Sequence, residues 1–211
     1  NPVWYTSYTP YQAEVSQGRL EALFVYQTMI SDLTGLPLAN CSLLDEATAA
    51  AEAVTMMRNL RSRDMVKAGV KKVLVDKKIF ANTLNVMRTR AKGQDIELVM
   101  VDYAMVTSDW LAVNGPFFGA IVQWPNADGA IEDYTAFIDD CHAAGMKVTV
   151  IADLMALALL KPLNADIMCG TAQRFGLPMG FGGPTAGYMA TRDEYKRDMP
   201  GRIIGLSKDT Y

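Results

Sequence analysis

The feature that most constrains the fold of this chain is an alternation of short β-branched runs with stretches of helical spacing. Strands that are apolar throughout are typical of a parallel sheet covered by helices on both faces, because neither face of such a strand meets water. The expected strands are residues 72–76, 97–101, 119–122, 147–153 and 188–190, and the expected helices between them span residues 79–91 and 131–144. The sequence therefore predicts an α/β fold with a mainly parallel sheet.

Two further helices are expected before the first strand. The first has Thr9 in a capping box, with Ser16 as a second possible start, and apolar residues recur on one face as far as Leu33 before Gly35 ends it. We expect residues 1–40 to form a helical N-terminal arm.

The second helix is expected to begin near Ser42, where Asp45 completes another capping box, and to run to about Lys67. Its first turns are rich in alanine, which lets a neighbouring element approach closely. Residues 41–211 are expected to form one α/β lobe.

Composition excludes several classes of function. The chain has 20 basic and 23 acidic residues, a net charge of −3 and no basic block, so a nucleic-acid partner is not expected. No apolar run reaches the ~18 residues of a membrane span, so no membrane partner is expected. Three scattered cysteines suit reduced thiols in the cytoplasm, and a single histidine argues against a metal site and a serine–histidine–aspartate site.

The ends of the sequence suggest a piece of a longer protein. The chain opens on Asn1 without an initiator methionine and ends at Tyr211 without a closing element.

Two aspartates, Asp76 and Asp153, end predicted strands and are candidates for a site. The ends of parallel strands are where ligands collect in open α/β sheets, but a carboxylate there can equally cap the next helix. Both readings remain open from the residues alone. The glycine-rich tract at 180–185 comes too late for a dinucleotide fingerprint and is expected to form a tight, close-packed turn between strands.

The segment from Trp4 to Gln12 contains four aromatic residues. Such a segment either docks against another domain or lines a site, because aromatic rings supply contact area and phenols supply directed hydrogen bonds.

Four tracts together resemble one family, the P-protein of the glycine cleavage system, which comprises the pyridoxal-phosphate-dependent glycine dehydrogenases (decarboxylating). They are residues 8–18, 40–49, 173–184 and 199–205, and they occur in the order that the family has. The resemblance covers essentially the whole chain. It implies the large domain of a fold-type I pyridoxal-phosphate enzyme, from the N-terminal of two related halves.

The resemblance also implies that this half does not hold the cofactor. In the C-terminal half of the family a lysine carries pyridoxal phosphate, and Gln173 stands at the similar position here, where an amide nitrogen cannot form a Schiff base. Asp153 resembles the aspartate that pairs with the pyridinium nitrogen. We expect these two positions to be vestigial, with no catalytic residue, metal or cofactor in this fragment.

The family resemblance implies that the active centre lies between the halves and that the N-terminal half contributes residues to it. The candidates in the arm are Tyr8, Thr9, Tyr11 and Gln12, and those at the start of the second helix are Asp45 and Glu46, for which simple helix capping is an equal alternative. The implied partners are the catalytic C-terminal half, glycine and lipoyl H-protein.

Three functions follow as hypotheses. The first is a fragment of a glycine decarboxylase that lines the active site of the catalytic half and is inactive alone. The second is a purely structural docking module. The third is a free-standing pyridoxal-phosphate enzyme that uses Lys161.

Overall fold

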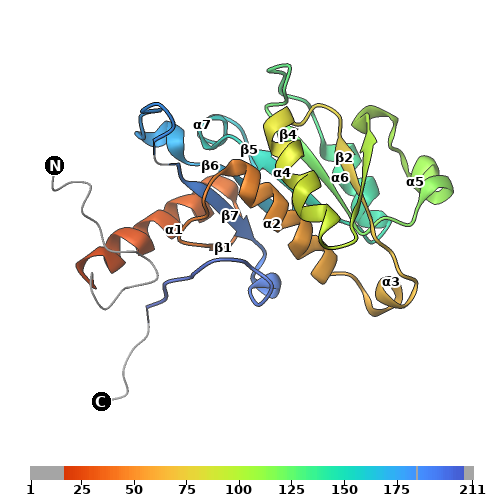
Figure 1. The fold of residues 1–211 in the computed structure, drawn as a ribbon, viewed down its shortest axis with the longest axis horizontal. Coiled ribbons are helices and arrows are strands. Elements are labelled where there is room, and N and C mark those ends of the chain that lie inside the picture. The colour runs from red at the N-terminus through yellow and green to blue at the C-terminus, as the bar shows by residue number, and fades with distance from the viewer. Residues whose placement is uncertain (1–16, 184, 207–211) are drawn as a thin grey trace, which may run out of the picture.

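A computed structural model describes residues 17–183 and 185–206, and it forms one seven-stranded sheet between two layers of helices (Figure 1). The strands are β1 (Leu38–Ala39), β2 (Lys72–Asp76), β3 (Glu97–Val101), β4 (Gly119–Trp124), β5 (Lys147–Ala152), β6 (Ile167–Thr171) and β7 (Gly187–Thr191). The α-helices are α1 (Leu20–Thr34), α2 (Glu46–Asn59), α3 (Arg63–Lys67), α4 (Ala81–Lys92), α5 (Ser108–Asn114), α6 (Thr135–Ala143) and α7 (Leu154–Leu157). Short 3-10 helices include η3 (Gln17–Arg19), η4 (Tyr103–Met105), η5 (Gln173–Phe175) and η6 (Asp193–Tyr195).

The sheet has the strand order β1-β7-β6-β5-β4-β2-β3. The five strands from β6 to β3 pair in parallel, whereas β7 is antiparallel to both β6 and β1. The prediction of a mainly parallel sheet is therefore confirmed. We call the edge at which β2, β4, β5 and β6 end the carboxyl edge, and the opposite edge the amino edge.

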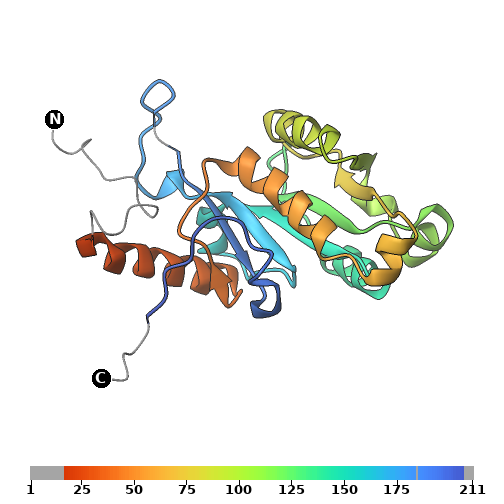
Figure 2. The ribbon, with the colours of Figure 1, turned by 60° about the horizontal axis from the view of Figure 1, so that its bottom comes forward.

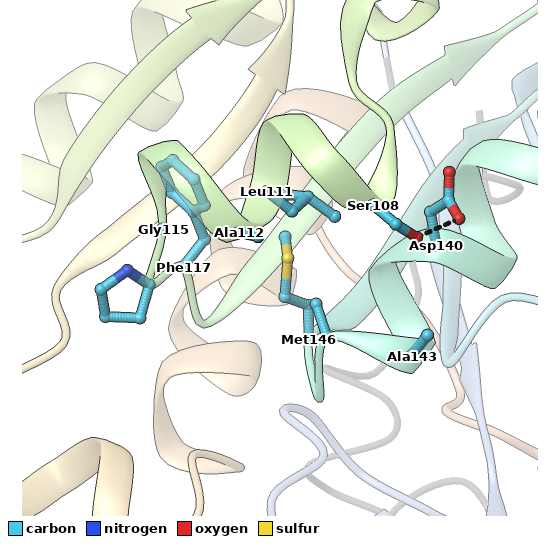
Figure 3. Close-up of a pocket in the computed structure, with 10 residues that line it drawn as sticks. Ser108, Leu111, Ala112, Gly115, Phe117, Asp140, Ala143 and Met146 are labelled. Carbon is cyan, nitrogen blue, oxygen red and sulfur yellow. Dashed lines mark hydrogen bonds between the residues drawn. The ribbon is translucent and has the colours of Figure 1, made fainter.

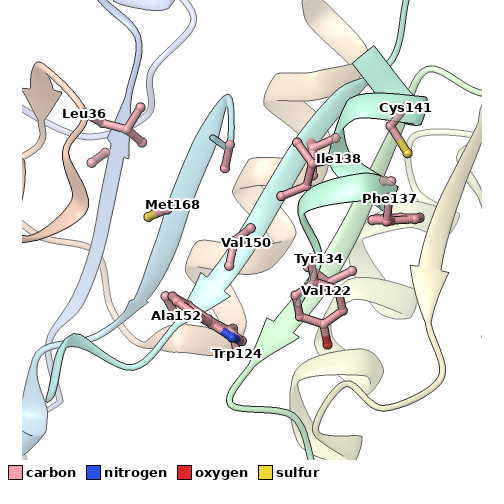
Figure 4. Close-up of a cluster of buried hydrophobic side chains, with 14 of the residues drawn as sticks. Leu36, Val122, Trp124, Tyr134, Phe137, Ile138, Cys141, Val150, Ala152 and Met168 are labelled. Carbon is pink, nitrogen blue, oxygen red and sulfur yellow. The ribbon is translucent and has the colours of Figure 1, made fainter. Parts of the chain in front are cut away.

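Two apolar cores cover the two faces of the sheet. One core combines strand residues with α1, α5, α6 and α7, and Figure 4 shows Trp124, Tyr134, Phe137, Val150 and Met168 among its side chains. The other core combines the opposite side chains of the same strands with α2 and α4. The helices on both faces agree with the apolar character of the strands.

The helix expected from Ser42 to Lys67 begins later and is broken. Residues 41–43 are not helical, because Leu43 N–H donates to the Gly187 carbonyl at 2.7 Å and Cys41 N–H to the Arg202 carbonyl at 2.8 Å. α2 then ends at Asn59, where the Arg61 side chain donates to the Arg58 carbonyl, and Ser62 caps a separate helix, α3.

Helix α1 ends as predicted, with Gly35 in the left-handed region at φ 67°. Thr9 and Ser16 lie outside the described residues, so the start of the arm remains a prediction. Ile30 of α1 and the following Leu36 belong to the same core as the sheet. The division at residue 40 likewise remains a prediction.

Candidate functional site

The carboxyl edge brings together Asp153, Gln173, Asp45 and Glu46. Asp153 directly follows β5 and Gln173 lies just after β6, and these two strands are parallel neighbours. Helix α2, which Asp45 caps and Glu46 begins, packs on β5, β6 and β7. Residues more than 100 positions apart in the sequence therefore meet at one edge of the sheet.

Asp153 has both of its carboxylate oxygens engaged. Oδ1 accepts a hydrogen bond from Met155 N–H at 2.9 Å and so caps α7, which confirms the capping reading. Oδ2 pairs with the guanidinium of Arg174, the residue after Gln173. The carboxylate that resembles a pyridinium partner is thus already committed to a helix and to an arginine.

Gln173 stands in η5 with its backbone fixed on both sides. Its N–H donates to Thr171 Oγ1 at 3.1 Å, and its carbonyl accepts from Leu177 N–H at 2.9 Å. The side chain supplies a carboxamide, which is not a nucleophile because its nitrogen lone pair is delocalised. Together with the Asp153–Arg174 pair, this set of residues does not fit covalently bound pyridoxal phosphate.

Glu46 is a carboxyl group at this edge whose pKa is raised. Burial raises its pKa to about 7, and the nearby carboxylates of Asp153 and Asp45 act in the same direction. The side chains of Gln123 and Thr83 lie close enough to lower that pKa in part. Glu46 therefore changes its charge near neutral pH.

Gln123 and Thr83 are the polar residues of this site that the sequence analysis missed. Both are buried, and both side chains lie close enough to the Glu46 carboxyl group to stabilise its charged form. The available signal was Gln123 itself, a polar residue inside an otherwise apolar strand. Arg174 was also missed, although it directly follows Gln173.

Asp45 acts as the N-cap of α2. Its Oδ1 accepts from Thr48 N–H at 2.7 Å, so the capping alternative for Asp45 is confirmed. The four arm candidates, Tyr8, Thr9, Tyr11 and Gln12, lie outside the described residues, and their role remains a prediction.

Asp76 is buried on the other face of the sheet. It is 2% exposed, and burial raises its pKa. It does not cap the next helix, since α4 begins at Ala81 after Phe80. Asp76 is thus not the helix cap that one of its two readings predicted.

The glycine-rich tract joins β6 to β7, as predicted, but it is not close-packed. Met179 is 82% exposed and Phe181 is fully exposed. A Cβ added at Gly182 would meet nothing within 4 Å. The glycines here serve a turn that projects into solvent rather than a tight approach to a neighbouring strand.

A cavity of about 490 Å³ lies at the amino edge, between α5 and α6 (Figure 3). Leu111, Phe117 and Met146 line it, and Ser108 donates a hydrogen bond to Asp140 at 2.6 Å at one end. It contains none of the residues predicted for the site, because those that are described lie at the opposite edge of the sheet.

Comparison with known proteins places this geometry in a family. The sequence model of the glycine cleavage system P-protein matches residues 1–211. The chain belongs to this family. Among curated relatives, glycine dehydrogenase (decarboxylating) of Bacteroides fragilis (strain YCH46) is 59% identical over 214 residues, and the mitochondrial protein of Solanum tuberosum is 53% identical over 213. The whole chain is covered in both alignments, but it spans only 22% and 20% of these relatives.

Solved structures agree with the fold. A crystal structure of glycine decarboxylase (P-protein) of the glycine cleavage system, in inhibitor-bound form, superposes with a TM-score of 0.81 at 37% identity, covering 97% of this chain and 46% of that chain. A putative L-allo-threonine aldolase from Listeria monocytogenes matches with a TM-score of 0.58 at 12% identity, covering 91% of this chain and 58% of that chain, and supports the fold alone. The fold-type I architecture expected from the sequence is confirmed.

Proposed function

We propose that this chain is a part of a glycine decarboxylase of the glycine cleavage system that shapes and lines an active site without holding the cofactor. The observation that carries the proposal is the composition of the carboxyl edge. Gln173 offers an amide where a Schiff base needs an amine, and Asp153 is paired with Arg174. The relatives of the chain bear the name glycine dehydrogenase (decarboxylating).

In the proposed enzyme, glycine is the substrate, lipoyl H-protein is the partner, and pyridoxal phosphate is held by the C-terminal half. This chain's own contribution is to fix polar groups at the boundary of the active site. Asp153 orients the Arg174 guanidinium, and Asp45 fixes the helix start that presents Glu46. The arm residues Tyr8, Thr9, Tyr11 and Gln12 are proposed to line the same boundary.

The alternative is a docking module with no residue in the active site. The use of Asp45 as a helix cap favours it, because that carboxylate is already engaged. Replacing Tyr8 and Tyr11 by phenylalanine in the full-length enzyme separates the two roles. Reduced turnover with intact assembly supports a lining role, whereas unchanged turnover and assembly supports docking alone.

A free-standing enzyme that uses Lys161 finds less support. Lys161 is exposed and lines a cavity beside Thr135 and Asp139 of α6. Lys161 therefore lies against α6, whereas the Asp153–Arg174 ion pair lies at the carboxyl edge of the sheet.

The test compares the 211-residue chain with the full-length parent enzyme. Each is mixed with glycine, pyridoxal phosphate and lipoyl H-protein, and glycine-dependent carbon dioxide release is measured. Borohydride reduction and peptide mapping then locate any lysine that has bound the cofactor. We expect release from the parent enzyme alone and no specific label on the chain. Carbon dioxide release by the chain, or stoichiometric labelling of Lys161, would overturn the proposal.

Localisation in the cytoplasm remains a prediction. Within the described residues, no helix has the length and apolar character needed to cross a membrane. The relative from Solanum tuberosum is named as mitochondrial.

A further inference from the structure

The loop at residues 176–183, which we call the glycine-rich loop, exposes large apolar side chains at the carboxyl edge. It projects from the body of the molecule between β6 and β7 (Figures 1 and 2). Phe181 is fully exposed and Met179 is 82% exposed. Phe175 and Leu44, which flank the loop, are 49% and 69% exposed. Exposed apolar side chains that gather on one segment are typical of a surface that contacts another protein.

The loop has the geometry of a fixed support for these side chains. Gly180, Phe181 and Gly182 all have positive φ angles, of 51°, 56° and 89°. For phenylalanine this conformation is uncommon, and the glycines on either side adopt a positive φ readily. Here the N–H groups of Gly182 and Gly183 both donate to the Met179 carbonyl, at 3.1 and 2.9 Å.

The base of the loop is anchored to the site. On one side Leu177 N–H donates to the Gln173 carbonyl at 2.9 Å. On the other, Thr185 Oγ1 donates to the Leu44 carbonyl at 2.6 Å, one residue before the N-cap of α2. The exposed rings are thus held in a defined position relative to Gln173 and Asp45.

The rest of the parent protein is large enough to supply a partner for the loop. The chain spans about a fifth of its curated relatives, so most of a P-protein of that length lies outside it. The carboxyl edge, from which the loop projects, is also the edge whose own residues do not fit the cofactor. The cofactor-carrying part of the enzyme must approach that edge if the two parts share one active site.

We propose that the glycine-rich loop is a docking element whose Phe181 and Met179 side chains insert into an apolar pocket on the cofactor-carrying part of the parent enzyme. This inference rests on the proposed function for the identity of the partner. The loop brings exposed apolar contact area, and the hydrogen bonds in its turn and at its base reduce the conformational freedom that docking would otherwise remove.

The test uses the full-length parent enzyme with the photoreactive residue p-benzoylphenylalanine at position 181. The matched control carries it at position 113, because Val113 of α5 is also 82% exposed but lies toward the amino edge. After irradiation, peptide mapping identifies the crosslinked segment. We expect position 181 to crosslink to the part that contains the cofactor lysine and position 113 not to do so. Crosslinks from position 181 only to a second copy of this lobe, only to H-protein, or to no protein would overturn the proposal.

A second measurement uses Phe181→Asn, which removes the ring but keeps a residue that readily adopts a positive φ. We expect glycine decarboxylation to fall at least about tenfold, as for a central interface anchor, with cofactor absorbance unchanged. Val113→Asn is the control and is expected to keep full activity. Full activity in Phe181→Asn would overturn the proposal. If the wild-type parent does not decarboxylate glycine, the proposed function fails, whereas the crosslinking result still decides whether the loop docks.

Discussion

Asp166 is a buried carboxylate at the amino edge, only 3% exposed, and it joins several elements. Its Oδ2 accepts from Val148 N–H at 2.8 Å and lies 2.8 Å from Nε2 of His142. Its Oδ1 accepts from the Tyr195 hydroxyl at 3.2 Å and pairs with Arg192 at 3.3 Å. His142, the single histidine of the chain, thus has a structural partner.

Replacing Asp166 by asparagine should strongly destabilise the fold. Asparagine keeps the size of the side chain but removes the negative charge that the hydrogen-bond donors around Asp166 face. Breaking a buried ion pair lowers the free energy of unfolding by about 3 kcal/mol. Urea unfolding measures this loss. Asp193→Asn is the control, because its ion pair with Lys196 is exposed and a change below about 0.5 kcal/mol is expected. A loss of under about 1 kcal/mol in Asp166→Asn would contradict the assignment.

Glu46 should make stability depend on pH. Its pKa rises from 4.5 in the unfolded chain to about 7 in the folded one, so the folded state holds a proton that the unfolded state releases. Stability therefore falls as the pH rises from about 4.5 to about 7. Glu46→Gln stays neutral, and we expect it to be more stable than the wild type by about 2 kcal/mol above pH 7 and equal to it below about pH 4.5. The expected stability difference is smaller than the full pKa shift would give. The Glu46 side chain is partly exposed, and a carboxylate at a helix N-terminus is stabilised by the helix dipole.

Urea unfolding at a series of pH values measures the difference between Glu46→Gln and the wild type. The matched control is Glu21→Gln, at an exposed position in the first turn of α1. A difference between Glu46→Gln and the wild type that does not change with pH would show that Glu46 has an ordinary pKa.

At the scale of elements, α2 depends on small side chains. Ala49, Ala50 and Ala53 are fully buried where α2 packs against α4 and the sheet. The alanine-rich first turns seen in the sequence correctly predicted this close approach.

Ala50→Leu should therefore destabilise the protein, although leucine is more apolar than alanine and nearly as good a helix former. Overpacking a filled core typically costs about 2 kcal/mol, which lowers Tm by about 4–8 °C in a chain of this size. Thermal unfolding followed by circular dichroism measures it. Ala112→Leu on α5 is the control, because that alanine is exposed and should shift Tm by little. An unchanged Tm for Ala50→Leu would mean that the packing of α2 against the sheet is loose.

The elements also show where prediction from sequence succeeds. β2, β4 and β5 were predicted because their runs are apolar and β-branched, and a buried strand needs both properties. β3 was predicted from the same pattern, although it is a partly exposed edge strand. β6 was missed because Gly170 interrupts its run. A Cβ at Gly170 would lie 2.3 Å from the Ala152 carbonyl oxygen and 2.9 Å from the Tyr188 ring, so the glycine is required by a neighbour that the local sequence does not reveal.

At the scale of the whole molecule, the two edges of the sheet differ in kind. The amino edge ties its charges together around Asp166, whereas the carboxyl edge carries Glu46, an ion pair between Asp153 and Arg174, and the exposed glycine-rich loop. The first edge carries a network of buried polar contacts. Proposed function and contact with the rest of the enzyme are concentrated at the second.

The sequence by itself determined the α/β layers and the amide at Gln173. Both follow from the chemistry of single residues and from their spacing along the chain. Only the tertiary structure decided that Arg174 forms an ion pair with Asp153 and that the Glu46 side chain is largely buried beside Gln123 and Thr83. It also decided that the Phe181 side chain is fully exposed. Charge pairing and desolvation depend on distances between residues far apart in the chain, and folding alone sets those distances.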